Sequence, residues 1–155
     1  MEDKKQLLNV FSLYIYIRGL FGNSISTIEE NAFNGLSSLL RLGLSFNRIT
    51  AIEGNAFNGL SSLSSLYLSN NSITTIQENA FNGLTSLSIL YINGNPFHCD
   101  CELKGFVRFM KSRRDILYGS SHPECLSPGV LKGTRLADLS VSNLTCLSND
   151  VSTIH

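Results

Sequence analysis

The sequence predicts a repeat protein, in which one short structural unit stacks on copies of itself. Two observations lead to this prediction. The six letters NAFNGL occur at residues 31–36, 55–60 and 79–84, always 24 residues apart. Between these copies, segments of the form L-x-L alternate apolar and variable residues, which is the pattern of a strand with one buried face. A phrase repeated at constant period indicates stacked units, because a catalytic site is assembled once from residues that differ.

Aligning the copies extends the period over most of each unit. The shared slots hold Leu39/Leu63/Leu87, Leu42/Leu66/Leu90, Leu44/Leu68/Ile92 and Asn23/Asn47/Asn71/Asn95, and the rings of Phe33/Phe57/Phe81 are expected to form a spine. We expect the apolar residues to meet in one continuous core that no single unit closes alone. The asparagines are expected to satisfy backbone groups where the strand turns inward, and their burial disfavours the alternative that they contact a ligand.

The pattern L-x-x-L-x-L-x-x-N-x-I, followed by AFxGL, resembles the leucine-rich repeat family over about residues 10–97. The resemblance implies an α/β fold: a short right-handed solenoid with a concave parallel β-sheet and a disulfide-bonded C-terminal cap. The expected segments are 1–28, a degenerate first repeat and N-terminal lid; 29–95, regular 24-residue repeats; 96–147, a cysteine-flanked cap; and 148–155, a tail.

The repeat pattern stops at residues 96–147, where a dissimilar module has to cover the apolar end of the last turn. Asp100 is placed to N-cap a helix that begins near Cys101. Four apolar residues then fall at helical spacing and predict one stripe facing the last repeat: Leu103, Phe106, Val107 and Met110.

The cap contains all four cysteines of the chain, and from the residues alone they allow three disulfide connectivities. The order NPF-x-C-x-C, helix, C, C is similar to the cap of extracellular leucine-rich-repeat proteins, and this resemblance implies the pairs Cys99–Cys125 and Cys101–Cys146. The alternative is a zinc site formed by His98, Cys99, Cys101, His122 and Cys125. Because a C-x-C pair is awkward for chelating one tetrahedral ion, we expect disulfides, with no metal and no cofactor.

Disulfides require an oxidising compartment, so we expect a secreted or extracellular protein. Glycosylation sequons at Asn70 and Asn143 agree with this location. The longest apolar run, residues 7–17, is too short to cross a bilayer. We interpret it as an edge strand, with the core of a signal peptide as the alternative. The formal net charge of zero does not favour a nucleic acid or an anionic membrane as partner.

The N-terminal stretch has no cysteine before Cys99, so the second cysteine-bearing cap of extracellular family members is missing. The first strand is therefore either covered by a self-made lid or left free to pair. We expect a homodimer, with a lidded monomer as the alternative. The candidate residues for self-association are Phe11, Tyr14, Ile15, Tyr16 and Ile17.

In this family the variable residues between the leucines point out of the concave sheet. The period arranges them in three columns: Ile17/Arg41/Ser65/Ile89, Gly19/Gly43/Tyr67/Tyr91 and Phe21/Ser45/Ser69/Asn93. The ligand-binding candidates are Arg41, Tyr67, Ile89, Tyr91 and Asn93. Tyrosine and arginine are typical of protein-recognition hot spots. The alternative is that the tyrosines pair across strands to stabilise the sheet.

The resemblance, which includes Toll-like receptor and Slit ectodomains and variable lymphocyte receptors, implies a recognition module of innate immune or adhesion type. We expect it to bind a protein or a microbial surface ligand; the alternative is a homodimerising scaffold without a concave-face ligand. The basic stretch from Lys104 to Arg114 is interpreted as a solvated helix face, with polyanion binding as the alternative. We expect no enzyme, because the histidines are scattered in the cap and tail and the inner face carries no carboxylate.

Overall fold

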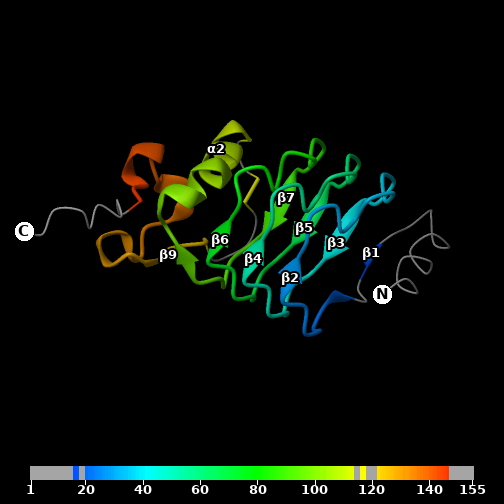
Figure 1. Ribbon diagram of the computed structural model, residues 1–155, viewed down its shortest axis with the longest axis horizontal. Helices are drawn as coiled ribbons and strands as arrows, with labels where there is room; N and C mark the ends of the chain where they lie inside the picture. The colour runs from blue at the N-terminus through cyan, green and yellow to red at the C-terminus, as the bar shows by residue number, and fades with distance from the viewer. Residues whose placement is uncertain (1–15, 18–19, 114–115, 118–121, 147–155) are drawn as a thin grey trace, which may run out of the picture.

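The computed structural model describes residues 16–17, 20–113, 116–117 and 122–146, with the backbone alone for residues 16–17. These residues form a stack of coils followed by a cap that contains helix α2 (Lys104–Ser112), as Figure 1 shows. The predicted α/β solenoid is therefore confirmed.

Each coil contributes one strand to a parallel sheet, which we call the main sheet. Its order is β1 (Tyr16–Ile17), β3 (Arg41–Gly43), β5 (Ser65–Tyr67) and β7 (Ile89–Tyr91), and we number the coils first to fourth by these strands. Leu42 pairs in register with Leu66, and Leu66 with Leu90. All three side chains are buried, so the repeated leucines do line up in one core.

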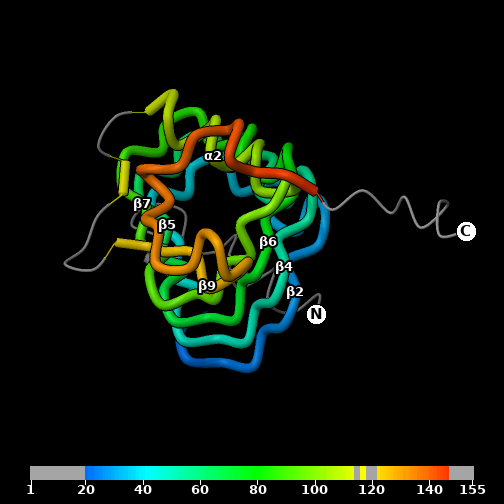
Figure 2. Tube along the Cα trace, turned by 90° about the vertical axis from the view of Figure 1, so that its left-hand side faces the viewer, coloured from blue at the N-terminus to red at the C-terminus, as the bar shows by residue number. Residues whose placement is uncertain are grey.

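A second parallel sheet, which the sequence did not predict, lies on the opposite side of the coils. It consists of β2 (Thr27–Ile28), β4 (Ala51–Ile52) and β6 (Thr75–Ile76). Figure 2 looks along the stack and shows β5 and β7 on one side of the windings and β2, β4 and β6 on the other. Ile52 and Ile76 are buried in the same cluster as the main-sheet leucines, so side chains from both sheets form the core.

The NAFNGL phrase turns the chain after each strand of the second sheet. Asn31 and Asn55 both take a positive φ of 58°, which asparagine tolerates better than most residues. The Phe57 ring lies 5.9 Å from that of Phe33 and 5.4 Å from that of Phe81, which is the predicted spine. The phrase recurs because each copy supplies the same turn and presents the same ring to the next copy.

The buried asparagines join successive coils through their side-chain amides. The Nδ2 of Asn71 donates to the Leu68 carbonyl in its own coil and to the Leu44 carbonyl in the coil before, both at 3.0 Å. Its Oδ1 accepts from the Ile49 backbone nitrogen at 3.1 Å. Asn47 and Asn95 make equivalent contacts. These three asparagines thus satisfy backbone groups that the core would otherwise leave unpaired, whereas Asn23 is exposed and its Nδ2 lies 3.5 Å from the Phe21 carbonyl of its own coil.

The first coil departs from the predicted register. The 24-residue period places Ile17 beside Arg41, but the structure pairs Tyr16 with Arg41 and Ile17 with Leu42. That prediction is wrong by one residue. The period is restored by residue 22, because the Gly22 nitrogen donates to Ser45 as the Phe46 nitrogen donates to Ser69. One extra residue therefore lies between Ile17 and Phe21, and it moves Ile17 to the register position of the buried Leu42.

The cap begins with the helix that the sequence predicted. The Asp100 Oδ1 accepts from the Glu102 nitrogen at 3.0 Å and caps the short 3₁₀ helix η2 (Cys101–Leu103), which continues into α2. The rings of Phe106 and Phe109 each lie 5.1 Å from Phe81, so the spine extends into the cap. The apolar stripe of Leu103, Phe106, Val107 and Met110 is buried as predicted.

The remainder of the cap covers the C-terminal edges of both sheets. Strand β8 (Phe97–His98) pairs in parallel with β9 (Cys125–Ser127). The His98 nitrogen also donates to the Thr74 carbonyl in the third coil at 2.8 Å. On the main sheet, the Leu90 nitrogen donates to Ile116 at 2.8 Å. Three 3₁₀ helices follow: η3 (Gly129–Leu131), η4 (Leu136–Asp138) and η5 (Val141–Asn143). Pairing at these edges removes a site of unwanted strand addition.

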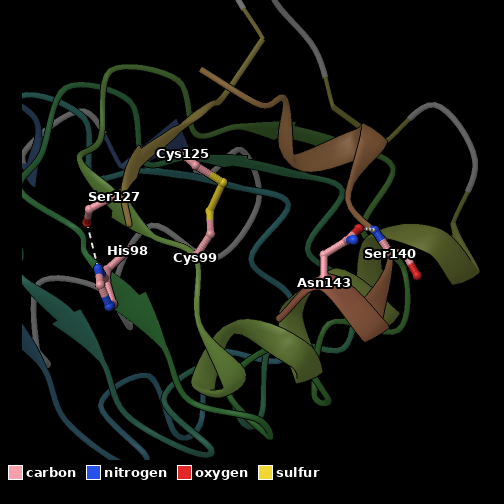
Figure 3. The surroundings of a disulfide bond; sticks show 6 residues. All are labelled: His98, Cys99, Cys125, Ser127, Ser140 and Asn143. Atoms are coloured by element: carbon pink, nitrogen blue, oxygen red, sulfur yellow. Dashed lines mark hydrogen bonds between the residues drawn. A yellow bond between two sulfur atoms is a disulfide. The ribbon is translucent and has the colours of Figure 1, made fainter. Parts of the chain in front are cut away.

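Two disulfides close the cap, and they are the pairs that the resemblance implied. Cys99 and Cys125 join β8 to β9, with their Cα atoms 5.7 Å apart (Figure 3). Cys101 and Cys146 join η2 to the end of the cap, with their Cα atoms 4.9 Å apart. The cap is therefore bonded covalently at the point where the repeats end.

We predict that replacing Asn71 with alanine destabilises the whole stack. The change leaves the Ile49 amide unpaired and removes one of two donors from the Leu44 and Leu68 carbonyls, which keep the Nδ2 of Asn47 and of Asn95. Since a buried unpaired group costs about 1–3 kcal/mol, we expect a loss of about 1–3 kcal/mol in the free energy of unfolding by urea. Asn82→Ala is the control, because Asn82 is exposed and its Nδ2 contacts exposed Asn79. An equal loss in both variants would contradict the proposed role of the buried amide.

We predict that the unreduced protein has no titratable thiol under denaturing conditions. The loops closed span 26 and 45 residues, so each bridge should stabilise the fold by roughly 3–4 kcal/mol on the loop-entropy model. Cys99 and Cys125 are also buried, whereas Cys146 is exposed. Urea unfolding should therefore show that the double alanine variant at 99 and 125 loses at least as much stability as the one at 101 and 146. A greater loss in the second variant would refute the contribution of burial.

Candidate functional site

The main sheet has one face directed away from the buried leucines, which we call the open face. Its positions are Arg41, Gly43, Ser65, Tyr67, Ile89 and Tyr91. Arg41 is exposed, and Tyr67, Ile89 and Tyr91 are half-buried. Arg41 and Ile89 occupy one column with Ser65 between them, so about 10 Å separates β3 from β7. The structure thus brings the predicted ligand-binding residues of these strands onto one face.

Tyr67 and Tyr91 form an ordered aromatic pair on the open face. Their backbones pair in register on β5 and β7, and their rings stack with centroids 4.8 Å apart and planes inclined by 10°. Stacked rings are already fixed in orientation, so a partner that contacts them loses little conformational entropy. The pair has the chemistry of an anchor for recognition.

The sheet's backbone ladder continues beyond the carboxyl ends of the strands. The Phe46 nitrogen donates to the Ser69 carbonyl, and the Asn70 nitrogen to the Asn93 carbonyl, both at 3.0 Å. The Ser69 hydroxyl also donates to the Asn93 Oδ1 at 2.7 Å. Asn93 therefore lies beside Ser69 at the end of the sheet, in the column that the period assigned to it.

Sequence reasoning missed an exposed aromatic pair at this end of the sheet. The rings of Phe21 and Phe46 lie 5.1 Å apart, with 48% and 54% of the two residues exposed. Phe46 also takes a positive φ of 58°, which is unusual for a bulky residue. The signal was present in the repeat, because Phe46 aligns with Gly22, Asn70 and Gly94, the residue types that most readily take this conformation.

Much of the basic stretch on the cap helix is engaged with the last repeat. The Arg108 guanidinium pairs with Glu78 at 3.1 Å. Arg113 donates to the carbonyls of Leu87 and Thr85 at 2.8 and 3.2 Å and lies over the Phe109 ring. Lys104 is half-buried and Lys111 is exposed, while Arg114 is outside the described residues. These contacts favour a role in docking the cap over a role in binding a polyanion.

His98 lies between a serine and an aspartate, an arrangement that sequence reasoning also missed. Its Nδ1 lies 2.6 Å from the Ser127 hydroxyl, as Figure 3 shows, and its Nε2 lies 3.4 Å from the Asp100 Oδ2. A nucleophilic serine needs donors for the developing oxyanion. The residue after Ser127 is Pro128, whose nitrogen has no hydrogen to donate. The trio is better explained as a link between β8, β9 and the helix cap than as a catalytic site.

The alternative zinc site conflicts with the observed state of its cysteines. Cys99, Cys101 and Cys125 are all in disulfides, so none is a thiolate that could bind a metal ion. Across residues 16–17, 20–113, 116–117 and 122–146, no group of three or more His, Cys, Asp and Glu side chains is arranged to hold a metal ion. His98 and His122 therefore lack the ligand set that the zinc hypothesis required.

The predicted modification and self-association sites have the following positions. Asn70 and Asn143 are both exposed. The Asn143 Oδ1 accepts from the Ser140 nitrogen at 2.9 Å in the capping box of η5 (Figure 3). Tyr16 and Ile17 form β1, the first strand of the main sheet, while Phe11, Tyr14 and Ile15 lie outside the described residues. Glycosylation and self-association remain predictions.

Comparison with known proteins agrees with this architecture. Residues 37–97 match the family model described as leucine rich repeat. The crystal structure of human 5T4, also named Wnt-activated inhibitory factor 1 or trophoblast glycoprotein, is similar with a TM-score of 0.67 at 24% sequence identity. The match covers 81% of this chain and 45% of that chain, so this chain spans less than half the length of that structure. This likeness concerns the fold.

The repeats define the class of protein, and the disulfides define its C-terminal end. Residues 37–97 are leucine-rich repeats, and the chain has the fold of a leucine-rich-repeat solenoid with a cysteine-bonded cap, so the resemblance predicted from the sequence is confirmed. Leucine-rich repeats typically form non-enzymatic scaffolds for protein recognition. Among the residues that the structure describes, none of the helices has the length and apolar character needed to cross a bilayer.

Proposed function

We propose that this protein is an extracellular recognition module that binds a protein or a microbial surface ligand through the open face of the main sheet. The proposed contact residues are Arg41, Tyr67, Ile89, Tyr91 and Asn93. The observation that carries the proposal is the stacked pair of Tyr67 and Tyr91, at 4.8 Å between ring centroids. The general role of leucine-rich repeats in protein recognition supports it.

The residues around the tyrosine pair support this role by their composition. Aromatic and arginine side chains dominate binding hot spots because they bury large areas or form several directed hydrogen bonds. On the open face, the tyrosines provide the area, Ile89 adds apolar surface in the next column, and Arg41 provides an exposed charge. The competing role of the tyrosines is to stabilise the sheet, which would require no partner.

The extracellular location is supported by two kinds of residue. Two disulfides require an oxidising compartment to form and persist. Asn70 and Asn143 lie in glycosylation sequons and are exposed. Recognition of an innate immune or adhesion type follows from the resemblance to extracellular family members with this kind of cap.

A non-enzymatic role is supported by the chemistry of the site. The open face carries hydroxyls, a guanidinium and apolar groups, but no carboxylate or histidine among its described positions. All four cysteines are in disulfides, so none can act as a nucleophile. We therefore propose binding, without covalent chemistry, as the function of this face.

Self-association through β1 is the second candidate function, because this strand is at the end of the main sheet. Within the described part of the chain, β1 pairs with β3 on one side and with no strand on the other. An edge strand presents backbone donors and acceptors to which a second copy can pair. A homodimer formed in this way would leave the tyrosine pair available to a separate ligand.

We predict that Tyr67→Ala and Tyr91→Ala weaken binding to a partner without unfolding the protein. The partner is first identified by screening the purified chain against protein, glycan and bacterial-surface arrays. Since hot-spot side chains contribute about 2 kcal/mol or more, each variant should bind at least about tenfold more weakly in titration calorimetry. Ser88→Ala, an exposed residue next to β7, is the matched control. Unchanged affinity together with lower stability would assign the tyrosines to the sheet alone.

We predict a dimer at micromolar concentration if β1 is the pairing edge. Light scattering would give twice the chain mass, and Tyr16→Pro should restore the monomer. Tyr16 pairs in register with Arg41. The equivalent nitrogens of Ser65 and Ile89 donate toward the preceding coil, so the Tyr16 nitrogen is on the outer edge of the sheet and proline there cannot donate to a second copy. Tyr67→Ala should leave the mass unchanged. A strictly monomeric mass for the parent protein would rule out self-association.

A further inference from the structure

The second coil differs from the third and fourth at the exposed positions around its main-sheet strand. Leu40, Arg41, Phe46 and Arg48 of the second coil align with Ser64, Ser65, Asn70 and Ser72 of the third and with Ser88, Ile89, Gly94 and Pro96 of the fourth. All four second-coil residues are exposed. Because the coils share one backbone path, the third coil shows that small polar residues satisfy the fold at these positions.

Phe46 is the residue least explained by the needs of the fold. Its position takes a positive φ in each coil: 70° at Gly22, 58° at Phe46, 55° at Asn70 and 73° at Gly94. Glycine and asparagine accept this conformation, whereas a bulky side chain is strained in it. Strain of this kind at an exposed residue points to a role outside the fold.

The Phe46 ring is already oriented by a second ring. Phe21, from the first coil, lies 5.1 Å away with the ring planes inclined by 51°, and about half of each residue is exposed. The residues equivalent to Phe21 in the later coils, Ser45, Ser69 and Asn93, are polar. The pair therefore forms an apolar ridge at the carboxyl end of the main sheet, beside the open face. Covering this ridge with an apolar group of a partner would be favourable, because it removes apolar surface from water.

Two arginines of the second coil are available to a charged partner. The ion pairs among the described residues are Arg108–Glu78 and His98–Asp100, so neither Arg41 nor Arg48 has a carboxylate within 4.0 Å there. The neighbouring positions at the end of the sheet, Ser45, Ser69 and Asn93, carry no charge. A partner at this place would therefore meet positive charge on either side of the Phe46 ring along the coil.

We propose that the second coil anchors a protein segment in which carboxylates flank an apolar side chain. The apolar side chain covers Phe21 and Phe46, and the carboxylates pair with Arg41 and Arg48. Arginine is suited to this role because its planar guanidinium can bind a carboxylate through two hydrogen bonds. The inference rests on the proposed function, since it specifies the partner of the face that includes Arg41.

The repeat provides matched variants for the test. Arg41→Ser with Arg48→Ser, and Phe46→Asn, install the residues that the third coil carries at the same positions. Because asparagine accepts the positive φ, Phe46→Asn should unfold at the same or a higher urea concentration than the parent. Urea unfolding of both variants thus shows that any loss of binding comes from the surface.

The probe is a phage-displayed library of random twelve-residue peptides selected on the full chain, with counter-selection on the variant carrying Arg41→Ser, Phe46→Asn and Arg48→Ala. Alanine replaces Arg48 in this variant, since serine at 48 would complete a glycosylation sequon with asparagine at 46. We expect the recovered peptides to combine Asp or Glu with an apolar residue. Synthetic peptides should bind at least about tenfold more weakly after Asp and Glu are replaced by Asn and Gln. Arg41→Ser with Arg48→Ser should weaken the acidic peptides about tenfold and the amide versions about twofold at most, whereas Phe46→Asn should weaken both.

Five results would overturn the proposal. One is the absence of any peptide enriched on the parent over the counter-selection variant, and another is recovery of peptides without carboxylates. The third is a parent dimer that Phe46→Asn converts to a monomer without peptide binding, since the ridge would then be occupied by a second copy. Binding that is lost in Tyr67→Ala but retained in the second-coil variants would refute this inference and leave the proposed function intact. Retention in every variant would refute both.

Discussion

The structure depends on one constraint: no coil can satisfy its own buried backbone. Strands of two or three residues leave carbonyls and amides inside the stack, and the Asn71 side chain supplies their partners in two coils at once. The same amide fixes the distance between the coils, so the leucines above and below it meet in register. A stack built in this way must end in something dissimilar, because its last coil offers the same unsatisfied groups.

The cap meets this requirement with contacts of three kinds. The Phe81 ring packs on Phe106, the Leu90 nitrogen finds the Ile116 carbonyl, and Arg113 donates to the carbonyls of Leu87 and Thr85. Apolar area, backbone pairing and a side-chain donor thus replace, at the last coil, what another coil would have supplied. The two disulfides then hold together a module too small to bury much apolar surface on its own.

The sequence predicted the parts of this structure that follow from periodicity. Leu42, Asn71 and Phe57 could be assigned because each has equivalents 24 residues away, and the resemblance supplied the cysteine pairs. Periodicity could not reveal the extra residue between Ile17 and Phe21, because a single insertion leaves both flanking patterns apolar. Periodicity also could not predict the contact between His98 and Ser127, because these residues are 29 positions apart in a module without repeats. Contacts of that kind depend on the path of the chain through the cap.

Repetition also separates what the fold needs from what it merely allows. In the second and third coils, the main-sheet leucines and the asparagines that join the coils are buried, and variation there would disturb their neighbours. At exposed positions the fold imposes only the backbone conformation, and the serines of the third coil satisfy it. Phe46 is an exception, because it adopts the same positive φ as its equivalents Asn70 and Gly94 although a bulky side chain is poorly suited to that conformation. Its exposed ring therefore marks a requirement that does not arise from stacking, and the unpaired Arg41 and Arg48 within the described residues lie in the same coil.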